Sequence, residues 1–284
     1  MRSRNIPGIK VPSITTVGHH PMRKLSPAVR LLLLLVIGLI PLTGCSKRDD
    51  TWERIEQSGV LRVGIDPTYP PFALADDAGL RGIDVDFAQA LAEELGLEAQ
   101  FTYFGYDGLY DALTTGQVDV LISALVILPE KTKDIAYSIP YFDAGLVLIA
   151  PASGSPVARI DDLNGKILAV ELGSIGHVTA LELQRNKGRF EIRTYGGVSE
   201  ALAAVGAGEA HAALVDSISG RLYLREMKSQ GDLSLAIVGN PVTSEPFAIA
   251  TRIDDRILKA KLNEAISRLI AAGKLTTIIE HHLD

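Results

Sequence analysis

The sequence predicts an α/β fold in which mostly parallel sheets are covered by helices. Short apolar segments alternate with amphipathic segments along most of the chain after residue 60. Such alternation is typical of parallel strands that are joined by helices. In addition, segment 113–123 (LTTGQVDVLIS) weakly repeats segment 205–215 (VGAGEAHAALV). Both read as a helix end, a glycine and an apolar strand, which predicts two similar lobes.

The expected strands are short apolar runs bounded by turn-forming residues. They cover 60–65, 100–104, 118–123, 146–150, 166–170, 190–194, 210–215, 233–238 and 246–250. The expected helices cover 85–95, 109–113, 176–184, 199–205, 217–228 and 254–272. The last helix has the clearest pattern, because Leu258, Leu262 and Leu269 share one face and Gly273 follows as a stop.

The N-terminal segment has the features of a secretory signal peptide. Residues 1–30 carry six Lys or Arg and no Asp or Glu, and an apolar run follows from Leu31 to Leu42. This run is too short to span a bilayer, which needs roughly 20 residues in a helix. We therefore expect residues 1–44 to direct export and to be removed, with translation starting at Met1 or Met22. The alternative is a buried core helix.

The residues Leu42-Thr43-Gly44-Cys45 resemble the lipobox of bacterial lipoproteins. The resemblance implies that Cys45 is acylated, that residues 45–52 form a tether, and that the protein is an exported cell-membrane lipoprotein facing the periplasm or the cell exterior. The alternative is an ordinary signal peptide with an incidental cysteine. Cys45 is the only cysteine in the sequence, so no disulfide can form within the chain.

Charge and composition exclude several classes of function. Without residues 1–44, 240 residues remain and the net charge moves from −6 to −12, because all six lost charges are positive. An acidic chain argues against nucleic acid as a partner. No Cys/His/Asp cluster has the spacing of a zinc site and no phosphate-binding loop is present, so we expect no metal and no cofactor. We expect His281 and His282 to lie in a solvated tail.

The carboxyl ends of the strands are the expected ligand-binding edge. In open α/β sheets, ligands bind beyond these ends. The two repeated strands therefore point to residues 123–126 in one lobe and to Asp216 in the other.

Five motifs follow one another along the chain: LRVGIDPTYPPF (61–72), GIDVD (82–86), GQVD (116–119), PEKTK (129–133) and YSIPY (137–141). In this order they resemble the motifs of family 3 of the bacterial extracellular solute-binding proteins, the receptors of polar amino-acid ABC transporters, and the likeness covers roughly residues 53–283. The resemblance implies a two-lobed periplasmic-binding-protein clamshell of type II, each lobe a mixed, mostly parallel sheet with flanking helices.

The same resemblance implies where the two lobes begin and end. We expect the chain to cross between them near residues 147–150 and 243–249. Lobe one then consists of 53–145 plus 250–284, and lobe two of 150–242.

The resemblance also implies ligand-binding residues in both lobes. Asp216 matches an acid that holds the ligand's ammonium group; its alternative role is to cap the helix that starts at Ser217. Tyr69 and Tyr106 match aromatic residues that stack on the ligand; their alternative role is core packing. Asp66 matches a residue that faces the ligand's distal end; its alternative role is to cap the turn that follows it.

The expected binding groups for a ligand carboxylate depart from the family pattern. The matching positions are Ser123, Ala124 and Leu125 after the first repeated strand, the loop Gly173, Ser174 and Ile175 at a helix N-terminus, and Lys131.

Lys131 stands where the family has an arginine that forks onto the carboxylate, and a lysine lacks that planar geometry. Val126 replaces a frequent hydroxyl, Ile175 replaces a usual threonine, and Glu171 adds a negative charge. Either Lys131 and the Gly173 loop bind the carboxylate alone, or the ligand is not an ordinary α-amino acid.

We therefore expect a monomeric receptor that is not an enzyme, binds an amino acid or similar small polar solute by hinge closure, and docks an ABC permease. One alternative is an enzyme of the cyclohexadienyl dehydratase type, which shares the fold and for which Glu171 is the candidate acid. The other is a ligand-sensing accessory protein, for which a fused kinase or transmembrane segment is expected.

Overall fold

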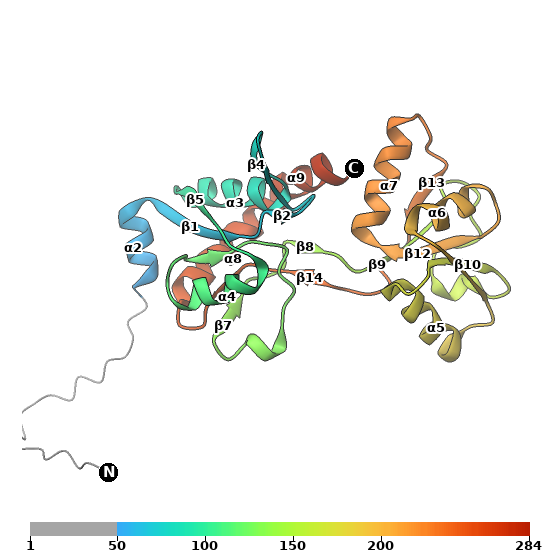
Figure 1. Cartoon of the computed structure of the whole chain (residues 1–284), viewed down its shortest axis with the longest axis horizontal. Coiled ribbons are helices and arrows are strands. Elements are labelled where there is room, and N and C mark those ends of the chain that lie inside the picture. Colours follow the sequence, from blue (N-terminus) through green and yellow to red (C-terminus); the bar gives the residue numbers. More distant parts are fainter. Residues whose placement is uncertain (1–49) are drawn as a thin grey trace, which may run out of the picture. The chain divides into compact units, whose positions relative to one another are not determined.

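The computed structural model describes residues 50–284. The expected signal peptide, Cys45 and most of the tether lie outside the described residues. No helix in the described part of the chain is long and apolar enough to cross a membrane. This part contains two five-stranded sheets, each covered by its own helices (Figure 1).

The first lobe is built on a sheet with the strand order β5-β1-β6-β15-β7. Its strands are β1 (Val60–Ile65), β5 (Glu98–Tyr103), β6 (Val120–Leu121), β7 (Ile135–Tyr137) and β15 (Ala250–Arg252). The strands β5, β1 and β6 are parallel, whereas β15 is antiparallel to both of its neighbours. Four strands therefore run in one direction and β15 runs against them.

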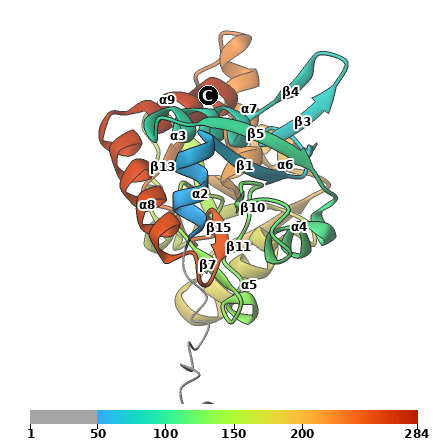
Figure 2. The same ribbon diagram turned by 90° about the vertical axis from the view of Figure 1, so that its left-hand side faces the viewer.

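Helices cover both faces of this sheet, because residues along its strands alternate between two cores. Leu61 and Val63 belong to one core and Leu121 to the other. The first core contains residues of α2 (Thr51–Ser58), α3 (Ile83–Glu94), α8 (Arg256–Ala271) and α9 (Lys274–Leu283). The second core contains residues of α4 (Tyr106–Thr114). Figure 2 shows α8 and α4 on opposite sides of the sheet.

The second lobe repeats this arrangement with the strand order β11-β10-β12-β9-β13. Its strands are β9 (Leu146–Pro151), β10 (Ile167–Glu171), β11 (Glu191–Tyr195), β12 (Ala212–Asp216) and β13 (Leu235–Val238). Again three neighbouring strands are parallel, and β9 is antiparallel to both of its neighbours. The helix α5 (Ile175–Lys187) packs on one face, and α6 (Val198–Gly206) and α7 (Ser217–Ser229) pack on the other.

The register of the central strands confirms the predicted similarity of the lobes. In the first sheet Val63 lies opposite Val120, and in the second Leu168 lies opposite Ala212. Residues 120 and 212 are also matched by the sequence repeat. Three residues further along β1 and β10, the chain reaches Asp66 and Glu171. These two acidic residues therefore occupy equivalent positions in the two lobes.

Two short strands form the crossing between the lobes. They are β8 (Phe142–Asp143) and β14 (Pro246–Phe247), which pair in antiparallel fashion. The expected first crossing at 147–150 is corrected by the structure, because these residues belong to β9, whose side chains are buried on both faces of the second sheet. A run buried on both sides is a central strand, so this crossing lies just before Leu146.

The carboxylate of Asp143 joins the two crossing segments. Its Oδ1 accepts hydrogen bonds from the backbone N–H groups of Gly145 (2.9 Å) and Glu245 (2.8 Å), and its Oδ2 accepts one from the Ser244 hydroxyl (2.6 Å). Burial raises the pKa of Asp143, but these hydrogen bonds outweigh it, so that its pKa lies below the ordinary value. The Thr243 hydroxyl adds a further link by accepting a hydrogen bond from Leu146 N–H (2.9 Å).

Several elements were not predicted from the sequence. They are α2, the small sheet of β2 (Thr68–Tyr69), β3 (Ala73–Asp76) and β4 (Gly79–Arg81), the strands β7 and β8, the short 3-10 helices 129–131 and 160–163, and α9. The expected solvated tail at His281 and His282 is a helix instead, and of these two residues only His281 is exposed. Both residues lie in α9, which buries Leu275 and Leu283, and His282 Nε2 lies 2.7 Å from Asp86 Oδ2.

We expect Gly145→Ala to destabilise the protein by about 1–3 kcal/mol, because overpacking at a close contact has this order of cost. A Cβ at Gly145 would lie 2.0 Å from the carbonyl oxygen of Thr243 in the other crossing segment. Urea denaturation measures the free energy of unfolding. The matched control is Gly206→Ala in α6, where no atom lies within 4 Å of the new Cβ. Equal stability of the two variants would contradict this reading of the crossing.

Candidate functional site

Two pockets lie at the carboxyl ends of the central strands, one in each lobe. The first-lobe pocket has a volume of about 320 Å³ and is lined by Asp66, Thr68, Tyr69, Tyr106, Ser123, Ala124, Val126, Glu245 and Phe247. The second-lobe pocket has a volume of about 240 Å³ and is lined by Leu146, Glu171, Ser174, Ile175, Gly176, Val198, Leu214, Val215 and Asp216. Most of the expected site residues therefore gather in these two pockets.

Asp66 is the buried acid of the first-lobe pocket, with 8% of its surface exposed. Its Oδ1 accepts hydrogen bonds from the backbone N–H (3.1 Å) and the hydroxyl (2.7 Å) of Thr68, which is the turn-capping role expected as the alternative. Its own N–H donates to the Ser123 hydroxyl (3.0 Å), which ties the ends of β1 and β6 together. Its Oδ2 has no hydrogen-bond partner among the described residues. This oxygen is free to accept a hydrogen bond from a ligand.

Two tyrosines provide the aromatic surface of the same pocket. Tyr69 and Tyr106 are each 49% exposed, and Tyr69 stacks on Phe72 with ring centroids 5.6 Å apart. Burial raises the pKa of Tyr69, and the negative charges of Asp216 and Glu245 raise it further. The carboxylates of both pockets therefore disfavour ionisation of the Tyr69 hydroxyl.

A buried network under the first-lobe pocket fixes the loop after β6. Ala124 has a φ of 47°, a left-handed conformation that is rare for residues other than glycine. Its N–H donates to Asp84 Oδ2 (2.7 Å), while the Tyr141 hydroxyl donates to Asp84 Oδ1 (2.7 Å). Asp84 is fully buried, and burial raises its pKa to about 7 against the opposing effect of these hydrogen bonds. Sequence reasoning missed this network, although Asp84 lies in the GIDVD motif.

The second-lobe pocket contains two carboxylates. Asp216 Oδ1 accepts a hydrogen bond from Ser219 N–H (2.8 Å), so Asp216 caps α7, the alternative role considered for it. Its Oδ2 has no hydrogen-bond partner within the described part of the chain, and the same holds for the Glu171 carboxylate. Neither Asp216 nor Glu171 forms a salt bridge with another described residue. Two anionic groups are thus available to a ligand in this pocket.

The N-terminus of α5 offers fewer free donors than the loop sequence suggests. Gly173 N–H donates to His177 Nδ1 (3.2 Å), Ser174 N–H donates to the Glu171 carbonyl (3.2 Å), and His177 N–H donates to the Ser174 hydroxyl (3.1 Å). Gly173 itself does not line the pocket. The Ile175 side chain is 69% exposed.

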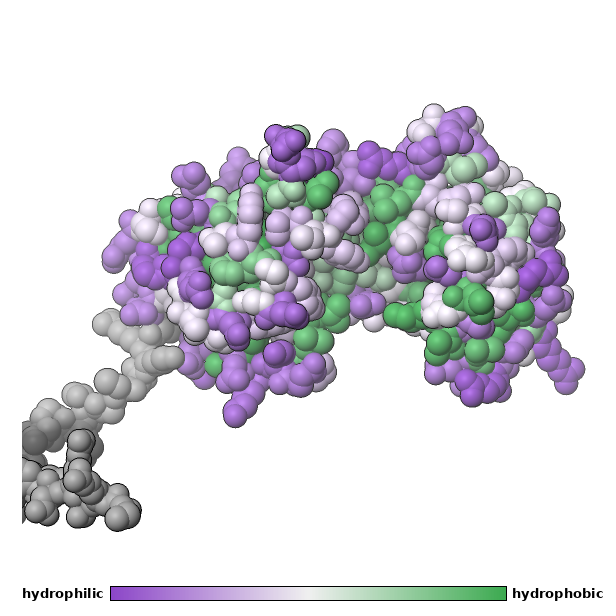
Figure 3. Space-filling model, in the orientation of Figure 1, coloured by the Kyte–Doolittle hydropathy of each residue, from purple (hydrophilic) through white to green (hydrophobic). Residues whose placement is uncertain are grey.

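Ile175 belongs to an exposed apolar surface that continues along one face of α5. The other members of this surface are Leu172, Val178 and Leu181. Figure 3 shows the apolar side chains gathered over this helix.

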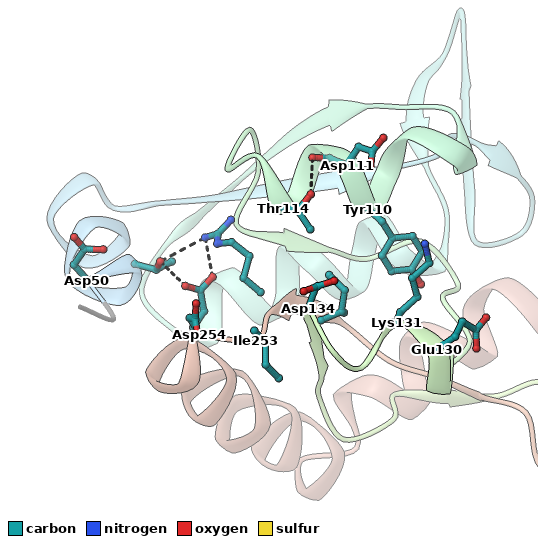
Figure 4. Close-up of a pocket in the computed structure, with 13 residues that line it drawn as sticks. Asp50, Tyr110, Asp111, Thr114, Glu130, Lys131, Asp134, Ile253 and Asp254 are labelled. Carbon is teal, nitrogen blue, oxygen red and sulfur yellow. Dashed lines mark hydrogen bonds and ion pairs between the residues drawn. The ribbon is translucent and has the colours of Figure 1, made fainter. Parts of the chain in front are cut away.

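Lys131 and Leu125 do not reach either pocket. Lys131 Nζ lies 5.1 Å from the centroid of the Tyr110 ring, in a separate pocket in which six of the thirteen lining residues are acidic (Figure 4). Leu125 is fully buried in the core beneath α4, and its carbonyl accepts a hydrogen bond from Ala248 N–H (3.0 Å). Of the groups expected to bind a ligand carboxylate, Leu125, Lys131 and Gly173 line neither pocket, whereas Ser123 and Ala124 line the first-lobe pocket and Ser174 and Ile175 line the second-lobe pocket.

Sequence reasoning also missed three residues of the first-lobe pocket, namely Thr68, Glu245 and Phe247. Thr68 lies within the first matched motif, whereas the other two come from the segment that crosses back into the first lobe and have no motif of their own. Among residues 50–284, no cluster of three or more His, Cys, Asp or Glu side chains is arranged to hold a metal ion.

Comparisons with known proteins identify similar binding proteins. The model of the family described as bacterial extracellular solute-binding proteins, family 3, matches residues 61–284. The L-cystine-binding protein TcyJ of Escherichia coli K12 is 30% identical over 265 residues, covering 90% of this chain and 96% of that protein.

Two solved structures are also similar. The L-cystine solute receptor of Neisseria gonorrhoeae in its unliganded open conformation has a TM-score of 0.70 and 26% identity, covering 82% of this chain and 96% of the other. An ancestral cationic amino-acid solute-binding protein has a TM-score of 0.59 and 32% identity, covering 82% of this chain and 100% of the other.

We expect the buried Asp84 to make the protein less stable as the pH rises towards 7. Its folded-state pKa is raised from 3.8 to about 7, so its contribution is fully present below 3.8 and is lost as the pH rises through 7. Each pH unit in this window lowers the free energy of unfolding by up to about 1.4 kcal/mol. Urea denaturation at several pH values measures this slope.

The matched variant is Asp84→Asn, which keeps the size of the side chain and removes its titration. The stability difference between the natural protein and this variant should shrink as the pH rises from about 4 to 7. Parallel stability curves for the two proteins would show that Asp84 does not titrate in this range.

Proposed function

Because the chain belongs to family 3 of the bacterial extracellular solute-binding proteins, we propose that it binds a small amine-bearing solute between its two lobes as the substrate-binding component of an ABC importer. The observation that carries this proposal is the pair of pockets at equivalent strand ends of two lobes that are joined by two short crossing segments. A solute that contacts both pockets favours the closed arrangement by its higher affinity for it.

The free oxygens of the acidic residues support the following binding roles. Asp216 holds an ammonium group with Oδ2 while its Oδ1 caps α7. Asp66 uses its own Oδ2 for the distal end of the solute, and Tyr69 and Tyr106 cover the solute's middle part. Exposed tyrosine rings suit this role, because they combine apolar area with attraction for a cation. Ser123 and the Ala124 backbone complete the floor of the first-lobe pocket.

The similar proteins support an amino acid or a close chemical relative as the solute. TcyJ is described as binding L-cystine, and the ancestral protein as binding cationic amino acids. The closed, loaded form then docks the membrane permease, acting as a monomer. Size-exclusion chromatography with light scattering tests the monomeric state.

We propose binding without catalysis. The dehydratase alternative requires Glu171 to act as an acid, and incubation with prephenate or arogenate would then yield an aromatic product. No observation on the described residues favours that reaction, and TcyJ, of which the alignment covers 96%, is a binding protein.

The proposal includes an anchor at Cys45, which follows the apolar segment 31–42. Cys45→Ser should move the protein from the membrane fraction to the soluble fraction, because the lipid expected at Cys45 would be lost. Cell fractionation and mass spectrometry of the N-terminal peptide measure the change. This part of the proposal would be overturned if the substitution left the membrane fraction unaltered and the N-terminal peptide of the natural protein carried no lipid mass.

Asp216→Asn should weaken solute binding at least tenfold in calorimetry while leaving stability nearly unchanged. Asparagine is as good an N-cap as aspartate, so the variant keeps the contact to Ser219 and loses only the negative charge. Asp216→Ala removes both, and should lose binding together with about 1 kcal/mol of stability. Unchanged affinity in the asparagine variant would contradict the proposal that Asp216 binds the ammonium group.

A further inference from the structure

The two pockets carry four carboxylates and no cationic side chain. Asp66 and Glu245 line the first-lobe pocket, and Glu171 and Asp216 line the second. No lysine or arginine among the described residues lines either pocket, and none forms a salt bridge with any of these four acids. Carboxylates that are left without partners in a pocket favour a ligand of the opposite charge.

The charges are placed at both ends of the proposed binding region. The register of the sheets puts Asp66 and Glu171 at equivalent positions in the two lobes. Asp66 is almost completely buried and keeps a free Oδ2, while Asp216 adds a second free oxygen beside Glu171 in the second-lobe pocket. Each lobe therefore offers its own acceptor for a positively charged group.

A ligand carboxylate has no cationic side chain as a partner in either pocket. Lys131 lies over the Tyr110 ring in another pocket, and the side chains of Val126 and Ile175 have no polar atom. Two of the N–H groups in the loop before α5 are already hydrogen-bonded to His177 and Glu171. A carboxylate in this region would face Glu171 and Asp216, and like charges at short range oppose binding.

From these observations we infer that the solute carries two cationic groups and no free carboxylate, as in an aliphatic diamine or an amine with a guanidinium group at its far end. One cationic group binds Asp66, the other binds Asp216 and Glu171, and the methylene chain lies against the rings of Tyr69 and Tyr106. This inference rests on the proposed function and names the class of solute for the same site.

Three pairs of compounds that differ only in the carboxylate provide the test: putrescine with ornithine, cadaverine with lysine, and agmatine with arginine. Isothermal titration calorimetry on the full-length protein measures each dissociation constant. In at least one pair the amine should bind at least tenfold more tightly than the amino acid.

The two ways of failing are distinguishable. If an amino acid, cystine included, binds as tightly as or more tightly than the amines, the inference is wrong and the proposed function stands. If no compound of either class binds, both the inference and the proposed class of amine-bearing solute are overturned.

A charge variant tests the role of Glu171 separately. Glu171→Gln should weaken amine binding at least fivefold and should narrow the preference for the amine over its amino acid, because it removes a charge that repels a carboxylate. The matched control is Glu182→Gln, at an exposed position of α5 outside both pockets, which should leave binding unchanged. An equal effect of the two variants, or a preference that does not change in Glu171→Gln, would overturn the inference.

Discussion

The connection between the two lobes depends on the hydrogen bonds that the Asp143 carboxylate makes across the two crossing segments. Each lobe has its own sheet and its own cores, so each can keep its internal packing while the crossing segments change. Gly145 lies so close to the Thr243 carbonyl that no side chain fits between the segments. Hinge motions are generally confined to a few residues, and the segments around Asp143 are the candidate hinge for the proposed closure.

Hydrogen bonds within the protein fix the shape of each pocket. Under the first-lobe pocket, buried Asp84 holds the left-handed Ala124 and the Tyr141 hydroxyl. In the second-lobe pocket, one oxygen of Asp216 caps α7 and leaves the other oxygen free. A carboxylate that is fixed by the fold loses little freedom on binding, which lowers the cost of binding a small solute.

The sequence predicted the parts of the fold that depend on local pattern. The strand 60–65 has the predicted bounds, and the repeated segment around residues 120 and 212 predicted the similarity of the lobes. The first crossing was predicted a few residues too far along the chain, because the apolar run 146–150 fits both a strand that links two lobes and a central strand of a sheet. The helix α9 was missed because only its packing against the first lobe shows that Leu275 and Leu283 are buried.

Site residues could be predicted where they belong to a sequence motif. They could not be predicted where only the packing of distant segments brings them to the site. Asp66, Tyr69 and Asp216 could be named from their positions at strand ends or in a motif. The packing of distant segments decides two other placements. It puts Lys131 over Tyr110, and it brings Glu245 of the crossing segment to the first-lobe pocket.

The central claim, that the two pockets close around one solute, is tested most directly by a distance between the lobes. Spin labels at the exposed positions Asp107 in α4 and Glu182 in α5, in a Cys45→Ser background, allow this distance to be measured by double electron–electron resonance. Saturation with a solute that binds in calorimetry should shift the distance distribution to a shorter mean value. A solute that binds with full affinity and leaves the distribution unchanged would contradict closure between the lobes.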